Sequence, residues 1–183
     1  NEKDNTNIPP NNKIWLDKMK NKKISIVTIC YNAEKYIQDT FNSIKRQTVK
    51  DFEYIVIDGG STDKTTDIIE RNQDIIDYWK SEKDGGISDA LNKGIAQSTG
   101  EYIVYLHADD YFYDDRSIEN ATSLLTGEID ILAFDIFFES ENGRKLGSPR
   151  GFGWYTNFKM PFYHPGIFCK RTLFSKIGYF DTQ

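Results

Sequence analysis

Apolar and polar positions after residue 23 follow two periods that alternate along the chain. Ile24–Cys30 is a short, β-branched and mostly apolar run, as expected of a strand buried on both faces. Ile37, Phe41 and Ile44 then recur at helical spacing, so Ala33–Gln47 is predicted to be an amphipathic helix. Repetition of such units predicts an α/β fold with a Rossmann-like, mainly parallel sheet flanked by helices.

The same pattern places the remaining elements. Further strands are predicted at Glu53–Ile57, Ile75–Ser81, Tyr102–Leu106, Ile129–Phe138 and Gly166–Lys170. Further helices are predicted at Lys64–Asn72, Ile87–Gln97, Asp115–Leu125 and Arg171–Ile177. Short polar side chains before Lys64–Asn72 are expected to cap that helix. Glu141–Gly143 is a turn signal, and Gly147–Pro165, rich in Gly, Pro and aromatics without a period, is predicted to be an active-site loop region.

Length and composition indicate one domain. The 183 residues are 38% hydrophobic, which suffices for one core and is too little for two. Residues 1–22 are rich in Asn and Lys, so we expect a polar N-terminal arm, followed by a single domain over residues 23–183. The opening residues do not read as a signal peptide, and no apolar run reaches transmembrane length.

Charge and cysteine usage narrow the function classes. The formal net charge of -5 argues against a nucleic-acid partner, because phosphate-binding surfaces are normally basic. Cys30 and Cys169 lie far apart in apolar runs and match no metal-ligand spacing, so we expect buried free thiols. Free thiols fit a reducing compartment, and the predicted location is therefore cytoplasmic.

Candidate chemistry follows the strands, because ligands of open α/β sheets bind outside the carboxyl ends of the strands. Asp109 and Asp110 follow a buried apolar strand, where two adjacent carboxylates repel each other. A divalent cation would relieve this repulsion, and Mg²⁺ or Mn²⁺ is typically bound by carboxylates together with substrate phosphates. The alternative is a turn or capping acid with an exposed neighbour. His107 and His164 have no second histidine at ligand spacing and are expected to be hydrogen-bonded structural residues.

Other polar positions at strand ends each have two interpretations. Asp58 could accept the N–H of a nucleobase, with Tyr31 as an aromatic contact, or could only bond its own backbone in an Asx turn. Asp89 and Lys93 stand four residues apart on a predicted helix, so a solvated ion pair is the alternative to a ligand-site role. Gly86 allows close approach of a ligand, but a turn also needs glycine.

Four segments in order carry a resemblance to a known family. They are Ile26–Asn32, Asp58–Asp63, Asp84–Gly94 and the pair Asp109–Asp110. Together they resemble glycosyltransferase family 2 over residues 24 to about 115. A later stretch, His164–Gly166 followed by Arg171 and Gly178–Asp181, resembles the acceptor-side half of that family.

The resemblance implies a GT-A fold, a nucleoside diphosphate sugar donor, a divalent metal and usually inversion at the anomeric carbon. By position, Tyr31 and Asp58 would meet the base, and Asp110 would be the direct ligand of Mn²⁺ or Mg²⁺. The donor-site candidates are Tyr31, Asn32, Asp58, Gly86, Asp89, Asn92 and Asp109. The metal candidates are Asp110 and Asp109.

Two departures from the family pattern affect the catalytic candidates. His107 stands near the place where many members have Asn or Asp in an Asp-x-Asp motif. The family's general base is an acid that often follows a Gly-x-Phe-Asp segment, here Gly178–Asp181. Since the sequence ends at Gln183, we expect the domain to be incomplete at its C-terminus and the base to lie beyond it. Asp181 is the candidate base within the chain.

The predicted acceptor is a saccharide or lipid-linked saccharide, as in bacterial-type surface polysaccharide or glycolipid synthesis. His164 and Trp154 are candidates for the acceptor side, because the aromatic residues of this stretch are types that stack on sugar rings. No transmembrane segment is expected, but peripheral association with the inner face of the membrane fits such an acceptor.

Three other function classes make different demands on the same residues. A nucleotidyltransferase should carry a Gly-rich, Arg-containing phosphate loop after its first strand, and a dinucleotide-binding oxidoreductase a G-x-G-x-x-G turn. Tyr31–Glu34 supplies neither. A non-catalytic sugar-nucleotide-binding module stays open, chiefly because the general base is expected to lie beyond Gln183.

Overall fold

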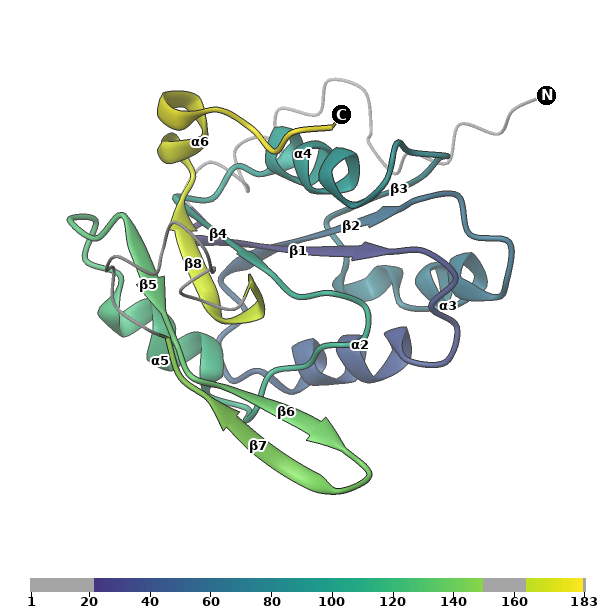
Figure 1. The fold of residues 1–183 in the computed structure, drawn as a ribbon, viewed down its shortest axis with the longest axis horizontal. Helices are drawn as coiled ribbons and strands as arrows, with labels where there is room; N and C mark the ends of the chain where they lie inside the picture. The colour runs from purple at the N-terminus through teal and green to yellow at the C-terminus, as the bar shows by residue number, and fades with distance from the viewer. Residues whose placement is uncertain (1–21, 150–163, 183) are drawn as a thin grey trace.

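A six-stranded sheet in the order β3-β2-β1-β4-β8-β5 forms the centre of the computed structural model, which describes residues 22–149 and 164–182 (Figure 1). Its strands are β1 (Ile24–Cys30), β2 (Phe52–Asp58), β3 (Tyr78–Ser81), β4 (Tyr102–Tyr105), β5 (Ile131–Ala133) and β8 (Ile167–Lys170). β3, β2, β1 and β4 run parallel, whereas β8 is antiparallel to both β4 and β5. The mainly parallel sheet predicted from the sequence is confirmed.

Helices cover both faces of this sheet. They are α2 (Ile37–Arg46), α3 (Thr65–Arg71), α4 (Ile87–Gln97), α5 (Ser117–Leu124) and α6 (Thr172–Ile177), with short 3₁₀ turns at Gln73–Ile75 and His164–Gly166. α2, α3 and α5 pack on one face, and α4 and α6 pack on the other (Figure 1). Every residue of β1 and β2 is buried, which explains why these strands lack a polar face.

The single strand predicted at Ile129–Phe138 is wrong. Ile131–Ala133 pairs with β8 in the main sheet, but the chain then leaves the sheet as β6 (Ile136–Ser140). β6 forms a separate antiparallel hairpin with β7 (Gly143–Gly147), which projects from the body (Figure 1). The predicted turn at Glu141–Gly143 connects the two strands. A continuous apolar run predicts extended chain, but it does not reveal which partner each part pairs with.

Other element boundaries differ from prediction for local reasons. α2 begins at Ile37 rather than Ala33, because the residues between them form a turn closed by a hydrogen bond from Tyr36 N–H to the Ala33 carbonyl. The N-cap residue of α3, Lys64, makes no side-chain cap hydrogen bond, so the predicted cap is not found there; Asp63, which precedes it, accepts the Thr65 N–H at 3.0 Å. β3 begins at Tyr78 rather than Ile75, because Ile75 ends a 3₁₀ turn and Ile76 and Asp77 connect that turn to the strand.

The expectation of buried free thiols is confirmed for Cys30 and only partly for Cys169. Both cysteines are free, but Cys169 is half-buried. Burial, with the nearby Asp58 charge, raises the pKa of the Cys30 thiol well above its usual range. Burial also raises the pKa of Cys169, to about 11. Both thiols are therefore weak nucleophiles, which fits packing rather than catalysis.

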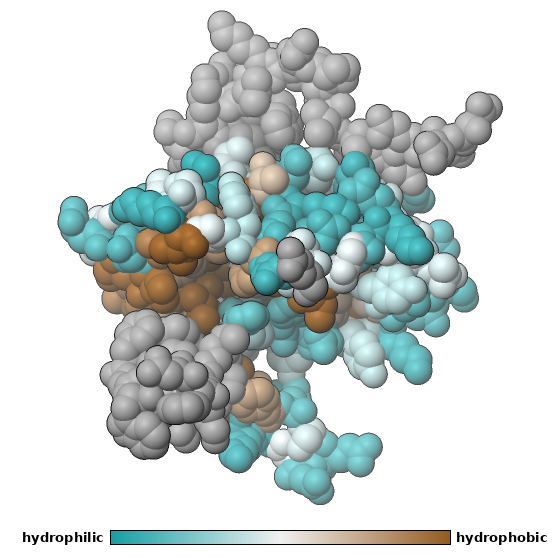
Figure 2. Space-filling model, turned by 45° about the horizontal axis from the view of Figure 1, so that its top comes forward, coloured by the Kyte–Doolittle hydropathy of each residue, from teal (hydrophilic) through white to brown (hydrophobic). Residues whose placement is uncertain are grey.

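The described surface is uneven in its hydropathy. Hydrophobic side chains gather on the left of the view in Figure 2, the side on which β5 lies in Figure 1, while hydrophilic side chains cover most of the remaining described surface. Among the described residues, no helix has both the length and the apolar character that crossing a bilayer demands.

Candidate functional site

The loops after β1 and β2 hold each other at the carboxyl edge of the sheet. The Asn32 N–H donates to the Ser61 hydroxyl at 2.8 Å, and the Asn32 side-chain oxygen accepts the Thr62 N–H at 2.9 Å. Asn32 has a φ of 50°, a left-handed conformation that asparagine adopts more readily than most residues. The Glu34 N–H also donates to the Asp63 carboxylate at 3.1 Å. These hydrogen bonds join the two loops into one unit.

Asp58 lies completely buried within this unit. Its Oδ2 accepts the Ser61 N–H at 2.9 Å, the Gly60 N–H at 3.2 Å and the Ser81 hydroxyl at 2.6 Å. Its Oδ1 accepts the Ser61 hydroxyl. The carboxylate thus makes the Asx-type turn that the sequence allowed as an alternative, and it also links β2 to the end of β3. A contact between Asp58 and a nucleobase stays a prediction.

A first hollow of about 610 Å³ opens beside the loops that follow β1 and β2. Its volume falls within the roughly 300–1,000 Å³ that is typical of ligand pockets. Its lining includes four of the predicted donor-site residues, Tyr31, Asn32, Gly86 and Asp109. The Tyr31 side chain is largely exposed, so its ring is open to a planar ligand. Gly86 immediately precedes α4, so the N-terminus of that helix adjoins the hollow.

Two charged residues of this lining, Lys83 and Asp84, are absent from the predicted donor site. Asp84 accepts the Gly86 N–H at 2.9 Å and lies against Gly59. A Cβ at Gly59 would stand 2.7 Å from the Asp84 carboxylate, so a larger residue there would force the Asp84 side chain to move. The second glycine-rich turn, which starts at Asp84, was visible in the sequence, but the contact between the two turns was not.

Asp89 and Asn92 lie on α4 and are not in the described lining of the first hollow. The Asp89 carboxylate accepts the Gly85 N–H at 3.0 Å and pairs with Lys93 at 3.1 Å, and these two contacts lower its pKa. The Asn92 side chain exchanges two hydrogen bonds of 2.9 Å with the backbone of Phe180. Asp89 therefore stabilises a turn, and Asn92 anchors the C-terminal segment. Their donor-site roles stay predictions.

Asp109 and Asp110 stand in the loop after β4, with Asp109 exposed and Asp110 half-buried. Burial and then the Asp109 charge raise the pKa of Asp110 to about 6, although its hydrogen bond from the His107 N–H acts in the opposite direction. In the described residues, no lysine or arginine forms a salt bridge with either carboxylate. This uncompensated negative charge fits a divalent cation.

The carboxylates of Asp109 and Asp110 are too few to complete the coordination of a cation, so a bound ligand would supply further oxygen atoms. Within residues 22–149 and 164–182, no group of three or more His, Cys, Asp or Glu side chains is placed to hold a metal ion. His107 is next to the acidic pair, but burial lowers its pKa and its charge is therefore absent at neutral pH. Two carboxylates completed by phosphate oxygens and water are a common way to bind Mg²⁺.

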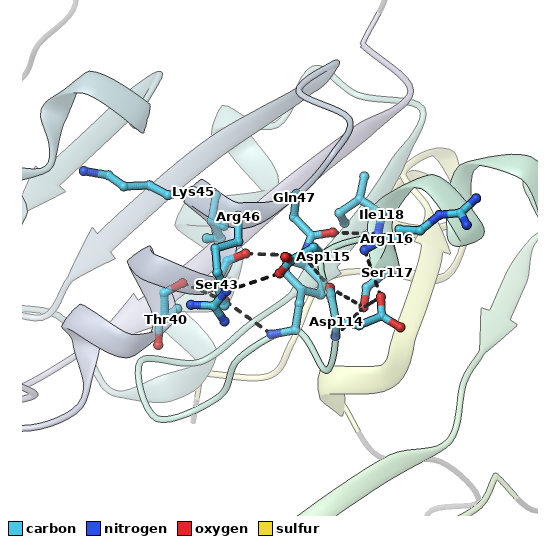
Figure 3. Close-up of polar contacts among 12 residues, drawn as sticks. Thr40, Ser43, Lys45, Arg46, Gln47, Asp114, Asp115, Arg116, Ser117 and Ile118 are labelled. Atoms are coloured by element: carbon cyan, nitrogen blue, oxygen red, sulfur yellow. Dashed lines mark hydrogen bonds and ion pairs between the residues drawn. The ribbon is translucent and has the colours of Figure 1, made fainter.

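Buried polar side chains of α2 and of its C-cap residue Gln47 form hydrogen bonds with the loop that follows β4 (Figure 3). The Thr40 hydroxyl lies 2.8 Å from the Asp110 carbonyl, and the Gln47 amide donates to the Asp114 carbonyl at 2.8 Å. The Ser43 hydroxyl accepts the Phe112 N–H at 3.3 Å. Thr40, Ser43 and Gln47 are each at most 2% exposed. These side chains satisfy loop backbone groups that would otherwise be buried without partners, and so they position Asp110.

A second hollow of about 750 Å³ lies on the other side of the acidic pair. Asp109 lines both hollows, and Asp110 lines the second. His164 also lines the second hollow, and burial followed by the neighbouring His107 lowers its pKa. Asp181 is exposed and is not in the described lining of either hollow. Trp154 lies outside the described residues.

Comparison with known proteins adds to this geometry. The model of the family described as Glycosyl transferase family 2 matches residues 25–180. A PGL/p-HBAD biosynthesis glycosyltransferase of Mycobacterium bovis (strain BCG / Pasteur 1173P2) is 32% identical over 170 residues, 87% of this chain and 63% of that protein. An uncharacterized glycosyltransferase of Mycobacterium tuberculosis (strain ATCC 25618 / H37Rv) is 36% identical over 106 residues, 57% of this chain and 40% of that protein. The chain thus spans only part of the length of these relatives.

Solved structures share the fold. S. aureus TarS 1-349 in complex with UDP has a TM-score of 0.68 and 23% sequence identity, over 87% of this chain and 50% of that chain. The mannosyltransferase PcManGT from Pyrobaculum calidifontis, in complex with GDP-Man and Mn²⁺, has a TM-score of 0.68 and 19% identity, over 93% of this chain and 53% of that chain. The GT-A fold predicted from the sequence is therefore confirmed.

Proposed function

Because the chain belongs to glycosyl transferase family 2, we propose that it transfers a sugar from a nucleoside diphosphate donor, a UDP-sugar, to an acceptor hydroxyl. The observation that carries this proposal is the meeting of two hollows at Asp109, beside the half-buried carboxylate of Asp110. TarS structures in complex with UDP and with UDP-GlcNAc support a nucleotide-sugar donor. The PcManGT complex with GDP-Man and Mn²⁺ supports a divalent metal.

On the donor side, the nucleotide occupies the first hollow. The exposed ring of Tyr31 is suited to contact the base, and Lys83 supplies a positive charge for the diphosphate. The N-terminus of α4 begins after Gly86, and its free N–H groups and helix dipole favour an anionic group at this place. Three independent features of this hollow therefore suit a nucleoside diphosphate.

At the junction of the hollows, Asp110 with Asp109 beside it would hold Mn²⁺ or Mg²⁺ together with diphosphate oxygens. A cation there would supply charge neutralisation for the departing nucleoside diphosphate. The acceptor hydroxyl in the second hollow attacks the anomeric carbon from the face opposite the leaving group, so the configuration inverts. Its proton passes to a carboxylate base, for which Asp181 is the candidate within the chain.

On the acceptor side, we propose a saccharide or lipid-linked saccharide that reaches the junction past His164. We further propose a role in glycolipid or surface polysaccharide synthesis at the cytoplasmic face of a membrane; the Mycobacterium bovis relative is named for PGL/p-HBAD biosynthesis. A non-catalytic sugar-nucleotide-binding module is the second candidate, because Asp181 is not in the described lining of the second hollow. Turnover of a UDP-sugar separates the two.

UDP is expected to bind this chain only when Mn²⁺ or Mg²⁺ is present, because the carboxylates of Asp109 and Asp110 repel a diphosphate that brings no cation. Titration calorimetry with Mn²⁺, with Mg²⁺ and with EDTA measures this dependence. UMP is the matched control, since it keeps the base and ribose but lacks the second phosphate. Equal affinity for UDP with and without metal would contradict a role for the cation in UDP binding.

Thr40→Val is expected to weaken Mn²⁺-dependent UDP binding by roughly tenfold, because the variant keeps the shape of Thr40 and loses the hydroxyl that bonds the Asp110 backbone. Thr40→Ser retains a hydroxyl and should restore most of the affinity. Calorimetry gives the affinities, and thermal melts show whether the fold is kept. If Thr40→Val binds UDP as wild type does, the hydroxyl does not position the motif.

A further inference from the structure

Tyr113 and Phe137 form an exposed aromatic pair in the second hollow. Their ring centroids are 4.9 Å apart with an interplanar angle of 24°, so the rings are stacked. Tyr113 is 65% exposed and Phe137 is 45% exposed, and both line the hollow. Tyr113 follows the acidic pair in the chain, whereas Phe137 belongs to β6. Two distant segments thus present one open aromatic surface close to Asp110.

Acidic side chains surround this aromatic pair. Asp135 and Glu139 line the same hollow as Asp109 and Asp110. Arg144 is the one lysine or arginine in the lining formed by the described residues, and its guanidinium already bonds Glu139 at 2.9 Å. With a cation on Asp109 and Asp110 and with Arg144 paired to Glu139, Asp135 still adds an excess negative charge beside the apolar rings.

The hairpin places these features side by side. Phe137 pairs with Leu146 and Glu139 pairs with Arg144 across the two strands. Alternate residues of a strand share a face, so Phe137 and Glu139 both point to one side of the hairpin. The Tyr111 hydroxyl donates to Glu139, just as Tyr113 stacks on Phe137. One face of β6 therefore offers a ring and hydrogen-bond acceptors together.

We propose that the second hollow binds an uncharged sugar ring of the acceptor, stacked on the Tyr113–Phe137 pair with its hydroxyls donating to Asp135 and Glu139. This inference rests on the proposed function, and it names the acceptor class. The C–H face of a sugar packs on aromatic rings, and carboxylates accept hydroxyl hydrogens but repel an anionic ring. A lipid chain would pack against the aromatic rings but would form no hydrogen bonds with the carboxylates. A neutral saccharide makes both interactions and therefore fits better.

The test is saturation-transfer NMR on the chain with UDP and diamagnetic Mg²⁺ present. The probes are methyl β-glucoside and methyl β-galactoside, each matched with its uronide, which differs only by a carboxylate at carbon 6. A neutral glycoside is expected to receive saturation and its uronide is not. Phe137→Ala should weaken that binding roughly five- to tenfold, and Tyr113→Ala should do the same. Leu124→Ala removes an exposed apolar side chain outside this lining and is the matched control.

A separate variant tests the role of negative charge in the second hollow. Asp135→Asn keeps the shape of the side chain and removes one negative charge, so the uronide is expected to gain affinity relative to its neutral partner. The inference is overturned if neutral glycosides and uronides bind with equal affinity, or if Phe137→Ala and Tyr113→Ala leave glycoside binding unchanged. Binding of a long-chain alkyl phosphate alone would also overturn it. Calorimetry with UDP on the same samples keeps the two hypotheses apart, because failure to bind UDP contradicts the proposed function and this inference with it.

Discussion

Asp110→Asn is expected to weaken Mn²⁺-dependent UDP binding by at least about a hundredfold, because it removes the half-buried carboxylate that would ligate the cation. The metal-free variant should keep its fold, since the asparagine oxygen can still accept the His107 N–H. Calorimetry and thermal melts on the same samples measure the two effects. Asp115→Asn is the matched control, because Asp115 is an exposed acid of the same loop that pairs with Arg46.

The pH dependence of stability supplies an independent check on Asp110. Burial and the Asp109 charge raise its pKa from 3.8 to about 6. A carboxyl group with a raised pKa stabilises the folded state below its unfolded pKa, and this contribution is lost as the pH rises through the folded pKa. Metal-free wild type should therefore lose stability as the pH rises toward 7, and Asp110→Asn should lack this loss. A strongly lowered melting temperature of the variant at pH 7.5 would instead indicate a structural role.

Asp58→Ala is expected to lower the free energy of unfolding by about 3 kcal/mol, which corresponds to a melting temperature roughly 10 °C lower. The variant leaves the half-buried N–H of Ser61 and the Ser81 hydroxyl without their acceptor. Melts by circular dichroism measure the change. Asp51→Ala is the control, because Asp51 is an exposed acid with a single ion pair to Lys22 and should cost little.

The same Asp58 variant separates the two roles that the sequence left open. If the carboxylate only builds the turn, stability falls strongly and any loss of UDP affinity follows from the disturbed loops. Asp58→Asn should then recover part of the stability, since it retains one acceptor oxygen. A variant that melts within about 2 °C of wild type and yet loses UDP binding would instead assign Asp58 to the ligand.

The bounds of a helix or strand were predictable from the sequence where a single hydrophobic period extends over the whole element. Ile24–Cys30 and Ile87–Gln97 have the predicted bounds, because every residue of the strand is buried and the apolar positions of the helix form one stripe. The division of Ile129–Phe138 was not predictable, because it depends on β8, which arrives later in the chain and pairs with only the first part. Pairing partners are a property of the whole sheet and not of the local pattern.

The candidate site was predictable to a similar degree. The acidic pair and the first hollow followed from polar residues at strand ends, since parallel strands bring those ends together. The second hollow was only partly predictable, because the sequence pattern places Phe137 in one long strand, Ile129–Phe138, and does not indicate the hairpin that brings Phe137 and Glu139 into the lining. Tyr111 and Tyr113 alternate with the buried Phe112, and this period of two was a signal in the sequence that they face one side. The partner residues on the hairpin had no such signal.

The insertion of β8 between β4 and β5 has a consequence for how the chain acquires its structure. During synthesis β4 and β5 leave the ribosome first, and neither can complete its pairing in this sheet until Ile167–Lys170 has emerged. Until then Tyr102, Ile103 and Val104 present an apolar strand edge with unpaired backbone groups. Such edges recruit strands from other molecules. A nascent chain stalled before Ile167 is therefore more prone to self-association than one that has just passed Lys170, and chaperone protection is needed most in that interval.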